Sequence, residues 1–242
     1  MAGHSKWSNI KHRKGAQDAK RGKVFTKLIK EITISSRIGG GDLSSNPRLR
    51  KAVSKAKASN LALDKIDRAI KKGTGELEGV TYEEMVYEGF GPNGVSIILE
   101  IITDNKNRSV AEIRHLLSKY GGKLGENGSV LWMFEKKGII IMDSRCGTEE
   151  DIMNLVIDCG AQDFKNEDGL YIIDTEPEQL LEVCELITTA GFELISSEVD
   201  LIPNTLQLVE KSESNPILQL LEELDDNDDV NKLYTNFKIA ID

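Results

Sequence analysis

Apolar residues recur at helical spacing in the first part of the chain. One stripe predicts a helix between Gly22 and Gly39, because residues three and four positions apart share one helix face. Its members are Val24, Phe25, Leu28, Ile29 and Ile32. Asn46 followed by Pro47 predicts the N-cap and first turn of a second helix. The apolar side of this second helix consists of Leu49, Ala52, Val53 and Ala56.

A third helix is expected from Asp64 to Lys72, with Gly73 as its stop. Its inward positions are Ile66, Ala69 and Ile70. Residues 1–21 show no apolar periodicity and are expected to form an extended or partly disordered arm. Three short helices and this arm predict a small N-terminal domain over residues 1–76.

From residue 82 onward, short apolar runs alternate with amphipathic stretches. The β-branched runs predict strands at 82–90, 95–102, 130–134, 139–142, 163–166, 170–173, 192–202 and 206–209. A last strand is expected to contain Leu233, Phe237 and Ile239. N-cap and capping-box patterns indicate helix starts at Ser109–Glu112, Thr148–Asp151, Thr175–Glu178 and Asn215–Pro216.

The order of elements between residues 139 and 202 is strand, helix, strand, strand, helix, strand, which is a split βαβ unit. The segments on either side are too short to fold alone, so we expect them to complete one domain around the insertion. The predicted fold class is therefore α+β. A three-helix domain (1–76) precedes a discontinuous α/β-sandwich domain (77–136 plus 204–242) and an inserted ferredoxin-like βαββαβ domain (137–203).

The charges of the chain are segregated. Residues 1–75 hold 19 Lys or Arg against 5 Asp or Glu, whereas the remaining residues hold 12 against 35. This asymmetry points to a polyanionic partner for the basic part, either nucleic acid or an anionic membrane. No apolar run approaches the about 18 residues that a membrane span needs, so we expect no membrane partner. Three scattered cysteines, Cys146, Cys159 and Cys184, suggest reduced thiols in a cytoplasmic protein.

The basic arm and helices are the candidate nucleic-acid contacts. Phosphates are expected to be held by Lys6, Lys11, Arg13, Lys14, Lys20, Arg21, Lys23, Lys27, Arg48, Arg50 and Lys51. Trp7 and His12 are expected to stack on a base or sugar. The alternative is a solvated tail that Trp7 anchors to the helices. A second contact, at Asn105, Asn107 and Arg108, competes with a plain strand-to-helix loop.

Other motifs in the chain do not indicate a nucleotide-binding, metal-binding or catalytic site. Gly89–Gly94 spells G-x-G-x-x-G, but a strand follows instead of a helix, so a hairpin turn is predicted. The acidic run Asp225–Asp229 lacks the glycine and the final glutamate of a calcium loop. The three histidines have no partners at zinc-ligand spacing. With no nucleophile or Walker motif, we predict no metal, no cofactor and no enzymatic activity.

Several motifs resemble those of the YebC/PmpR family. They are MAGHSKWSNIKHRKGAQD at 1–18, KRGKVFTK at 20–27, NPRLR at 46–50, YEGFGPNG at 87–94, TDNKNR at 103–108 and GSV at 128–130. The resemblance covers essentially the whole chain. It implies a cytoplasmic, non-enzymatic protein with a helical N-terminal domain and two α/β-sandwich domains, one inserted in the other. Family members are assigned as DNA-binding transcriptional regulators, while mitochondrial relatives look like translational activators and bacterial members have been linked to ribosomes stalled on proline-rich sequence.

We therefore expect a non-enzymatic, nucleic-acid-binding regulator of gene expression, acting on promoter DNA. The alternative is a ribosome-associated translation factor that binds ribosomal RNA and relieves stalling at proline-rich sequences. A more distant possibility is a protein-interaction module built on the split βαβ domain. No helix displays a clear set of base-reading residues, which weakens sequence-specific DNA readout. A monomer is expected, and the sequence separates the DNA and RNA targets poorly.

Overall fold

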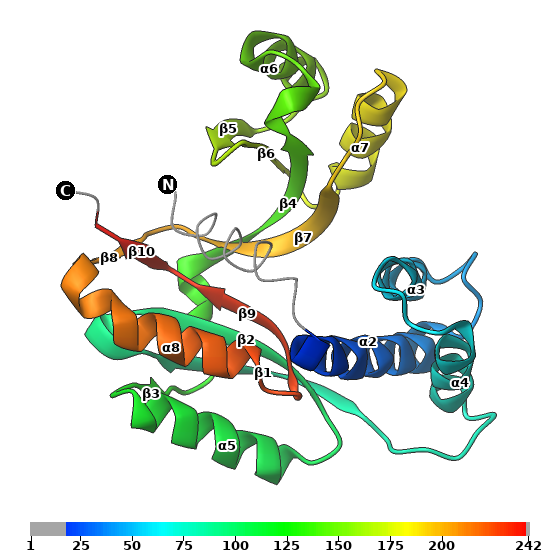
Figure 1. The fold of residues 1–242 in the computed structure, drawn as a ribbon, viewed down its shortest axis with the longest axis vertical. Coiled ribbons are helices and arrows are strands. Elements are labelled where there is room, and N and C mark those ends of the chain that lie inside the picture. Colours follow the sequence, from blue (N-terminus) through cyan, green and yellow to red (C-terminus); the bar gives the residue numbers. More distant parts are fainter. Residues whose placement is uncertain (1–17, 241–242) are drawn as a thin grey trace. The chain divides into compact units, whose positions relative to one another are not determined.

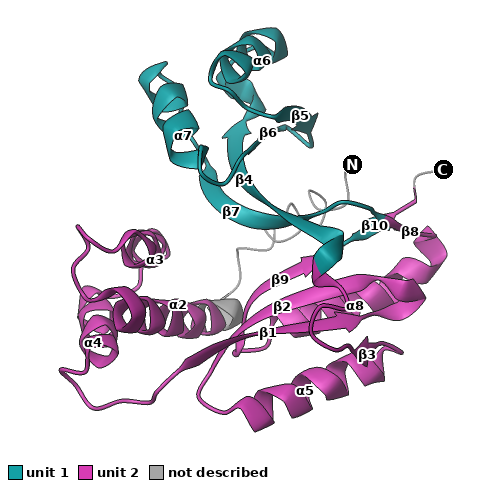
Figure 2. Ribbon diagram, turned by 180° about the vertical axis from the view of Figure 1, so that it is seen from behind, with its two compact units in different colours: residues 1–11, 132–206, 236–238 teal, residues 12–131, 207–235, 239–242 magenta. Residues whose placement is uncertain are grey.

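The computed structural model describes residues 18–240, and their side chains from residue 22 onward. The described chain forms two compact units, coloured separately in Figure 2. We call residues 18–131, 207–235 and 239–240 the helix–sheet unit, and residues 132–206 and 236–238 the split-βαβ unit. None of the described helices is both long and apolar enough to cross a membrane.

The helix–sheet unit begins with helices α2 (Asp18–Gly39), α3 (Pro47–Ala58) and α4 (Leu63–Thr74). Figure 1 shows α3 and α4 beside α2. Their shared core includes Ile32 from α2, Leu49 from α3 and Ile66 from α4. The three predicted helices are therefore confirmed, and their apolar stripes face one another.

The predicted helix boundaries need two corrections. Helix α2 already includes Asp18, so residues 18–21 are not part of an extended arm and Gly22 lies inside the helix. The segment contains Ala, Lys and Arg, which favour helix without an apolar stripe. Gly73 does not end α4. It lies within the helix, where a Cβ atom would come within 2.4 Å of the Thr33 carbonyl oxygen, and Gly75 ends the helix at a φ of 84°.

The sheet of this unit has the order β3-β1-β2-β9 and is antiparallel throughout. Its strands are β1 (Glu83–Phe90), β2 (Ser96–Thr103), β3 (Lys123–Leu124) and β9 (Val230–Thr235). Strands β1 and β2 form a hairpin through the 3-10 turn η1 (Pro92–Gly94), which confirms the hairpin prediction. Strand β9 pairs along β2, so the chain's tail shares a sheet with its middle.

Helices α5 (Lys106–Lys119) and α8 (Ser214–Asp225) lie together in this unit (Figure 1). The predicted capping box at Ser109–Glu112 is wrong. Asn105 caps α5 by accepting a hydrogen bond from the Arg108 amide, and Ser109 is buried inside the helix. The capping-box pattern failed because the Ser109 hydroxyl has a distant partner, Asp229.

The split-βαβ unit contains β4 (Phe134–Asp143), α6 (Glu149–Asp158), β5 (Asp163–Glu167), β6 (Leu170–Thr175), α7 (Leu180–Thr189) and β7 (Ser196–Pro203). Its antiparallel sheet has the order β5-β6-β4-β7, the arrangement of a split βαβ fold. Ile140 and Ile173 on the sheet pack with Ile152 of α6 and Val183 of α7. Three helices followed by sheet domains confirm the predicted α+β class.

Several short elements differ from prediction. The expected strand at 130–134 is a 3-10 turn, η2 (Leu131–Met133), that leads into the single long strand β4. Helix α7 begins after Gln179, later than its pattern indicated, and β7 begins at Ser196. The last expected strand is two strands, β9 and β10 (Phe237–Ile239). The remaining elements are η3 (Ser144–Cys146), β8 (Gln207–Val209) and η4 (Lys211–Glu213). The three predicted domain boundaries stay predictions.

Candidate nucleic-acid interface

Helix α3 displays an exposed surface of positive charge. It carries five basic residues and no acidic one, and its buried face is occupied by small and aliphatic side chains. Asn46 fixes where the helix begins, since its side chain accepts a hydrogen bond from the Leu49 amide at 3.0 Å. We define the basic helix surface as Arg50, Lys51, Lys55 and Lys57 of α3 with Lys65 and Arg68 of α4, all exposed.

Four cations of this surface are not neutralised by a neighbour. Lys55, Lys57, Lys65 and Arg68 have no ion-pair partner within the part of the chain that the structure describes. Arg50 donates hydrogen bonds to the carbonyl oxygens of residues 43 and 44, at 2.8 and 3.2 Å, which orients its guanidinium without cancelling its charge. Phosphate groups are therefore the ligands that this surface fits best.

Arg48 has a different environment, although it was predicted as a contact beside Arg50. Its guanidinium lies 2.8 Å from Glu31 of α2 and also pairs with Glu84 of β1. The hydrogen bond to Glu84, opposed by partial burial and helped by Glu31, raises the pKa of Arg48. Arg48 thus links α3 to α2 and β1, and its role as a phosphate contact stays a prediction.

Helix α2 turns its lysines toward the acidic turn at residues 225–229. Lys23, Lys27 and Lys30 follow one another at helical spacing, so they share one face of α2. Lys23 lies 3.5 Å from the Asp226 carboxylate, and Lys27 lies 3.8 Å from that of Asp225. Two predicted nucleic-acid contacts, Lys23 and Lys27, therefore face carboxylates of their own chain.

Asp229 is the centre of this contact and is only 4% exposed. Its carboxylate accepts hydrogen bonds from Lys30 Nζ at 2.6 Å and from the Ser109 hydroxyl at 2.6 Å. Thr103 at 3.0 Å and Arg108 at 3.1 Å complete its shell. Burial alone would raise the pKa of Asp229, but the hydrogen bonds from Lys30, Ser109 and Arg108 lower it to about 2. The carboxylate is therefore charged at neutral pH.

The predicted second contact is partly occupied by this network. Arg108 pairs with Asp104 at 2.7 Å as well as with Asp229, and the Asn105 side chain caps α5. Asn107 is exposed on the first turn of α5. These arrangements are those of a structural strand-to-helix junction, and the phosphate contact at these residues stays a prediction.

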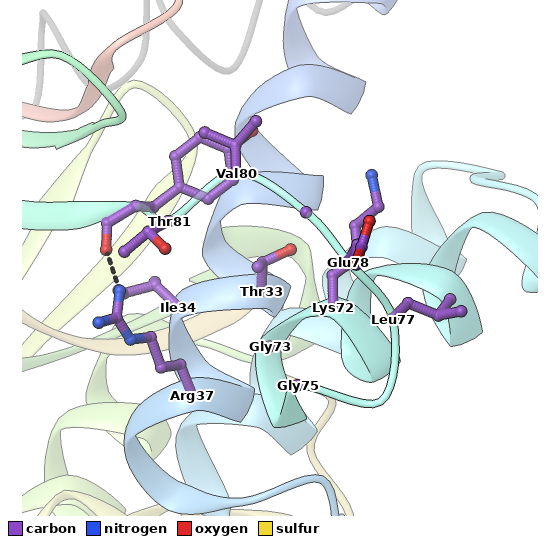
Figure 3. A pocket seen from close by; sticks show the side chains of 12 residues that line it. Thr33, Ile34, Arg37, Lys72, Gly73, Gly75, Leu77, Glu78, Val80 and Thr81 are labelled. Atoms are coloured by element: carbon purple, nitrogen blue, oxygen red, sulfur yellow. Dashed lines mark hydrogen bonds between the residues drawn. The ribbon is translucent and has the colours of Figure 1, made fainter.

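A pocket of about 320 Å³ opens between α2, the C-terminal end of α4 and the linker at 75–82 (Figure 3). Arg37 closes one side of it by donating a hydrogen bond to the Tyr82 carbonyl oxygen at 2.9 Å. Lys72 and Glu78 give the lining opposite charges. None of the predicted contacts that the structure describes lines this pocket. The hydrogen bond from Arg37 holds the linker against α2.

Several predicted contacts cannot be placed. Lys6, Trp7, Lys11, His12, Arg13 and Lys14 lie outside the described residues. Lys20 and Arg21 belong to α2, but their side chains are not described. Among the described positions, sequence reasoning missed the acidic turn as the partner of α2, because about 200 residues separate the two segments.

Two family models match the chain. The model described as the TACO1/YebC protein N-terminal domain matches residues 5–76, and the model described as the TACO1/YebC second and third domain matches residues 82–237.

Individual relatives match along nearly their whole length. The chain is 52% identical over 241 residues to a probable transcriptional regulatory protein of Magnetococcus marinus, covering 99% of this chain and 96% of the relative. It is 50% identical over 240 residues to another of Geobacter sulfurreducens, covering 99% and 97%. A crystal structure of a conserved hypothetical protein from Aquifex aeolicus superposes with a TM-score of 0.84 at 39% identity, covering 93% of each chain.

Proposed function

The chain belongs to the TACO1/YebC family, and from this premise we propose that it is a regulator of gene expression that binds nucleic acid. Its N-terminal arm and basic helix surface form the binding region. The proposal assigns no catalytic step to any residue. The names of the relatives in Magnetococcus marinus and Geobacter sulfurreducens support the regulatory role.

The observation that carries the proposal is the set of unpaired cations on α3 and α4. A chain with 40 acidic and 31 basic residues has enough carboxylates to neutralise every lysine and arginine. Lys55, Lys57, Lys65 and Arg68 nevertheless stay without an ion-pair partner among residues 22–240. A phosphate backbone supplies the missing negative charge and releases counterions when it binds.

The first candidate target is promoter DNA, the target that would suit a chain whose relatives are named probable transcriptional regulatory proteins. The second candidate is ribosomal RNA, and the composition of α3 favours it. The helix has no Asn or Gln to read adenine, and its two arginines are held by Glu31, Glu84 and backbone carbonyls. Its lysines act as point charges that hold phosphates of any sequence.

The experiment is a salt titration of binding with the double variant Lys55→Ala/Lys57→Ala. We expect about a tenfold loss of affinity near physiological salt and a fall of about 1.8 in the slope of log K against log salt, because two phosphate contacts are removed. The charge-matched control is Lys136→Ala/Lys211→Ala, which removes two exposed lysines from other elements. An equal loss in both variants contradicts the assignment to α3.

The same titration distinguishes the two targets. Promoter fragments with excess competitor DNA form one arm, and salt-washed ribosomes with free ribosomal RNA form the other. Retention of the unmodified protein on ribosomes alone supports the translational role, and a promoter footprint that survives the competitor supports the transcriptional role. Failure to bind in both arms contradicts the proposed function.

A further inference from the structure

The pocket between α2, the C-terminal end of α4 and the linker at 75–82, which we call the linker pocket, is lined by cations from two helices (Figure 3). Arg37 comes from α2 and Lys72 from α4. Neither has an ion-pair partner within the described part of the chain. The hydrogen bond from Arg37 to the Tyr82 carbonyl oxygen uses one of the five N–H donors of a guanidinium. Both cations therefore keep donors for an anionic ligand.

The cationic side of the linker pocket continues the basic helix surface. Lys65, Arg68 and Lys72 are spaced by three and four residues along α4, so they lie along one side of the helix over about 10 Å of its axis. All three are exposed. A strand whose phosphates follow Lys65 and Arg68 therefore reaches the pocket at Lys72.

The apolar part of the lining suits a flat ring. Ile34 is buried, whereas Leu77 and Val80 are 40% and 52% exposed, so contact with the face of a base removes apolar surface from water. The volume of about 320 Å³ lies at the lower end of the roughly 300–1,000 Å³ of small-molecule sites. A pocket of this size with cations and apolar walls matches one ligand group that combines a phosphate with a ring.

Glu78 gives the linker pocket a chemical preference. It lines the pocket and has no ion-pair partner among residues 22–240. A carboxylate accepts hydrogen bonds and donates none, so it disfavours a free phosphate ion and favours a ligand with N–H donors. The amino groups of adenine, cytosine and guanine are such donors, whereas uracil carries a carbonyl oxygen where cytosine carries its amino group.

We propose that the linker pocket binds one unpaired nucleotide of a nucleic-acid strand. Arg37 and Lys72 hold its phosphate, and Glu78 accepts a hydrogen bond from the amino group of its base. This inference rests on the nucleic-acid binding proposed above and adds the contact to a base that α3 lacks. The base has to be unpaired, because a paired base is stacked in the duplex and uses its amino group there.

The experiment measures binding of the full chain to oligo(rC) and oligo(rU) of equal length by fluorescence anisotropy, with CMP and UMP as free nucleotides in parallel. We expect oligo(rC) to bind about fivefold more tightly than oligo(rU), the difference made by one hydrogen bond. Glu78→Gln should reduce this ratio to less than about twofold, because an amide also offers a donor to uracil. The matched control is Glu76→Gln, which removes an exposed carboxylate of the same linker that does not line the pocket and should keep the ratio.

The phosphate contact is tested separately with Lys72→Ala. We expect it to weaken binding of both oligonucleotides about 3- to 10-fold and to lower the slope of log K against log salt by about 0.7, because one phosphate contact to a single strand is removed. The control is Lys71→Ala, which removes a neighbouring lysine that pairs with Asp67 at 2.8 Å and does not line the pocket. Its loss should stay below about twofold.

Equal affinity of the parent protein for oligo(rC) and oligo(rU) overturns the linker-pocket proposal. So does a ratio that Glu78→Gln and Glu76→Gln lower alike, or an equal loss in Lys72→Ala and Lys71→Ala. CMP binding as tight as that of oligo(rC) contradicts the assignment to a strand, because it shows a site for free nucleotides. If Lys55→Ala/Lys57→Ala weakens binding to promoter DNA or ribosomes while neither oligonucleotide depends on the pocket, only the pocket proposal fails. If the parent protein binds no nucleic acid, both proposals fail.

Discussion

Helices α2 and α3 are both rich in lysine, yet their lysines have opposite environments. Lys23, Lys27 and Lys30 of α2 contact the acidic turn at 225–229. Lys55 and Lys57 of α3 are exposed and have no ion-pair partner in the described chain. A count of positive charges treats the two helices alike, whereas in the structure the lysines of α2 form an internal contact and those of α3 form an exposed surface.

The difference follows from burial. Lys30 and Asp229 are both nearly inaccessible to water, and a buried pair holds two elements together only when further hydrogen bonds complete the shell. Ser109, Thr103 and Arg108 supply those bonds. The α2 contact therefore joins the N-terminal helices to the sheet, which makes α2 a support for the basic helix surface and not an extension of it.

The largest expected effect comes from removing the centre of the α2 contact. Asp229→Ala leaves the Lys30 ammonium buried without a counter-charge, so we expect a loss of about 3–5 kcal/mol in the free energy of unfolding. Urea unfolding followed by circular dichroism measures it. The control is Asp228→Ala, because Asp228 is exposed and contributes only its carbonyl oxygen to Lys30. A similar loss in both variants would remove the special role given to Asp229.

The next effect is a dependence of stability on acid. The pKa of Asp229 is lowered from 3.8 to about 2, so its contribution is complete above pH 4 and is lost as the pH falls from about 4 to 2. A shift of this size corresponds to about 2 kcal/mol. Unfolding measured at several pH values should show this loss in the parent protein. In Asp229→Asn the loss over the same interval should be smaller, and an unchanged slope would contradict the assignment.

A smaller effect tests whether the carboxylates of the acidic turn prevent the lysines of α2 from binding nucleic acid. The double variant Asp225→Asn/Asp226→Asn removes the two negative charges that lie beside the ammonium groups of Lys27 and Lys23. We expect affinity for nucleic acid to rise about threefold at low salt, with the gain fading as salt increases. Glu149→Gln/Glu150→Gln on α6 is the charge-matched control. If the control raises affinity equally, net charge explains the result and the α2 contact does not.

The smallest effect is expected for the exposed end of the same contact. Lys23 and Asp226 form a solvent-exposed pair at 3.5 Å, so Lys23→Ala should change the free energy of unfolding by less than about 0.5 kcal/mol. Thermal unfolding compared with the parent protein measures this. A change as large as that of Asp229→Ala would show that the ion pairs of α2 act as one unit instead of being dominated by their buried member.

Local patterns predicted most of the fold. Asn46 and Pro47 indicated the start of α3, and the buried side of that helix is the predicted one. The start of α5 was wrong because Ser109 has its partner at residue 229 and not in the first turn. The local pattern predicts a helix stop at Gly73, because a sequence pattern does not show that α4 packs against the Thr33 carbonyl at this glycine.

The candidate site was less predictable than the fold. Charge counting found the basic region but did not separate Arg48, held by Glu31 and Glu84, from Lys55 and Lys57. These ion pairs join residues that are distant in sequence, and a single amino-acid sequence does not indicate which distant residues pair.

The pairing of β9 with β2 has a consequence for how the chain is made. Strand β2 is complete at residue 103, but its neighbour on one side is not synthesised until residues 230–235. Lys30 likewise waits for Asp229. The helix–sheet unit therefore reaches its native state only when translation is almost finished, whereas the split-βαβ sheet is built from a continuous stretch of chain and has all its strands by residue 203. A premature stop that removes β9 leaves the backbone N–H and C=O groups along one edge of the apolar strand β2 unpaired. We therefore expect such a product to aggregate or be degraded, and not to persist as a shortened regulator.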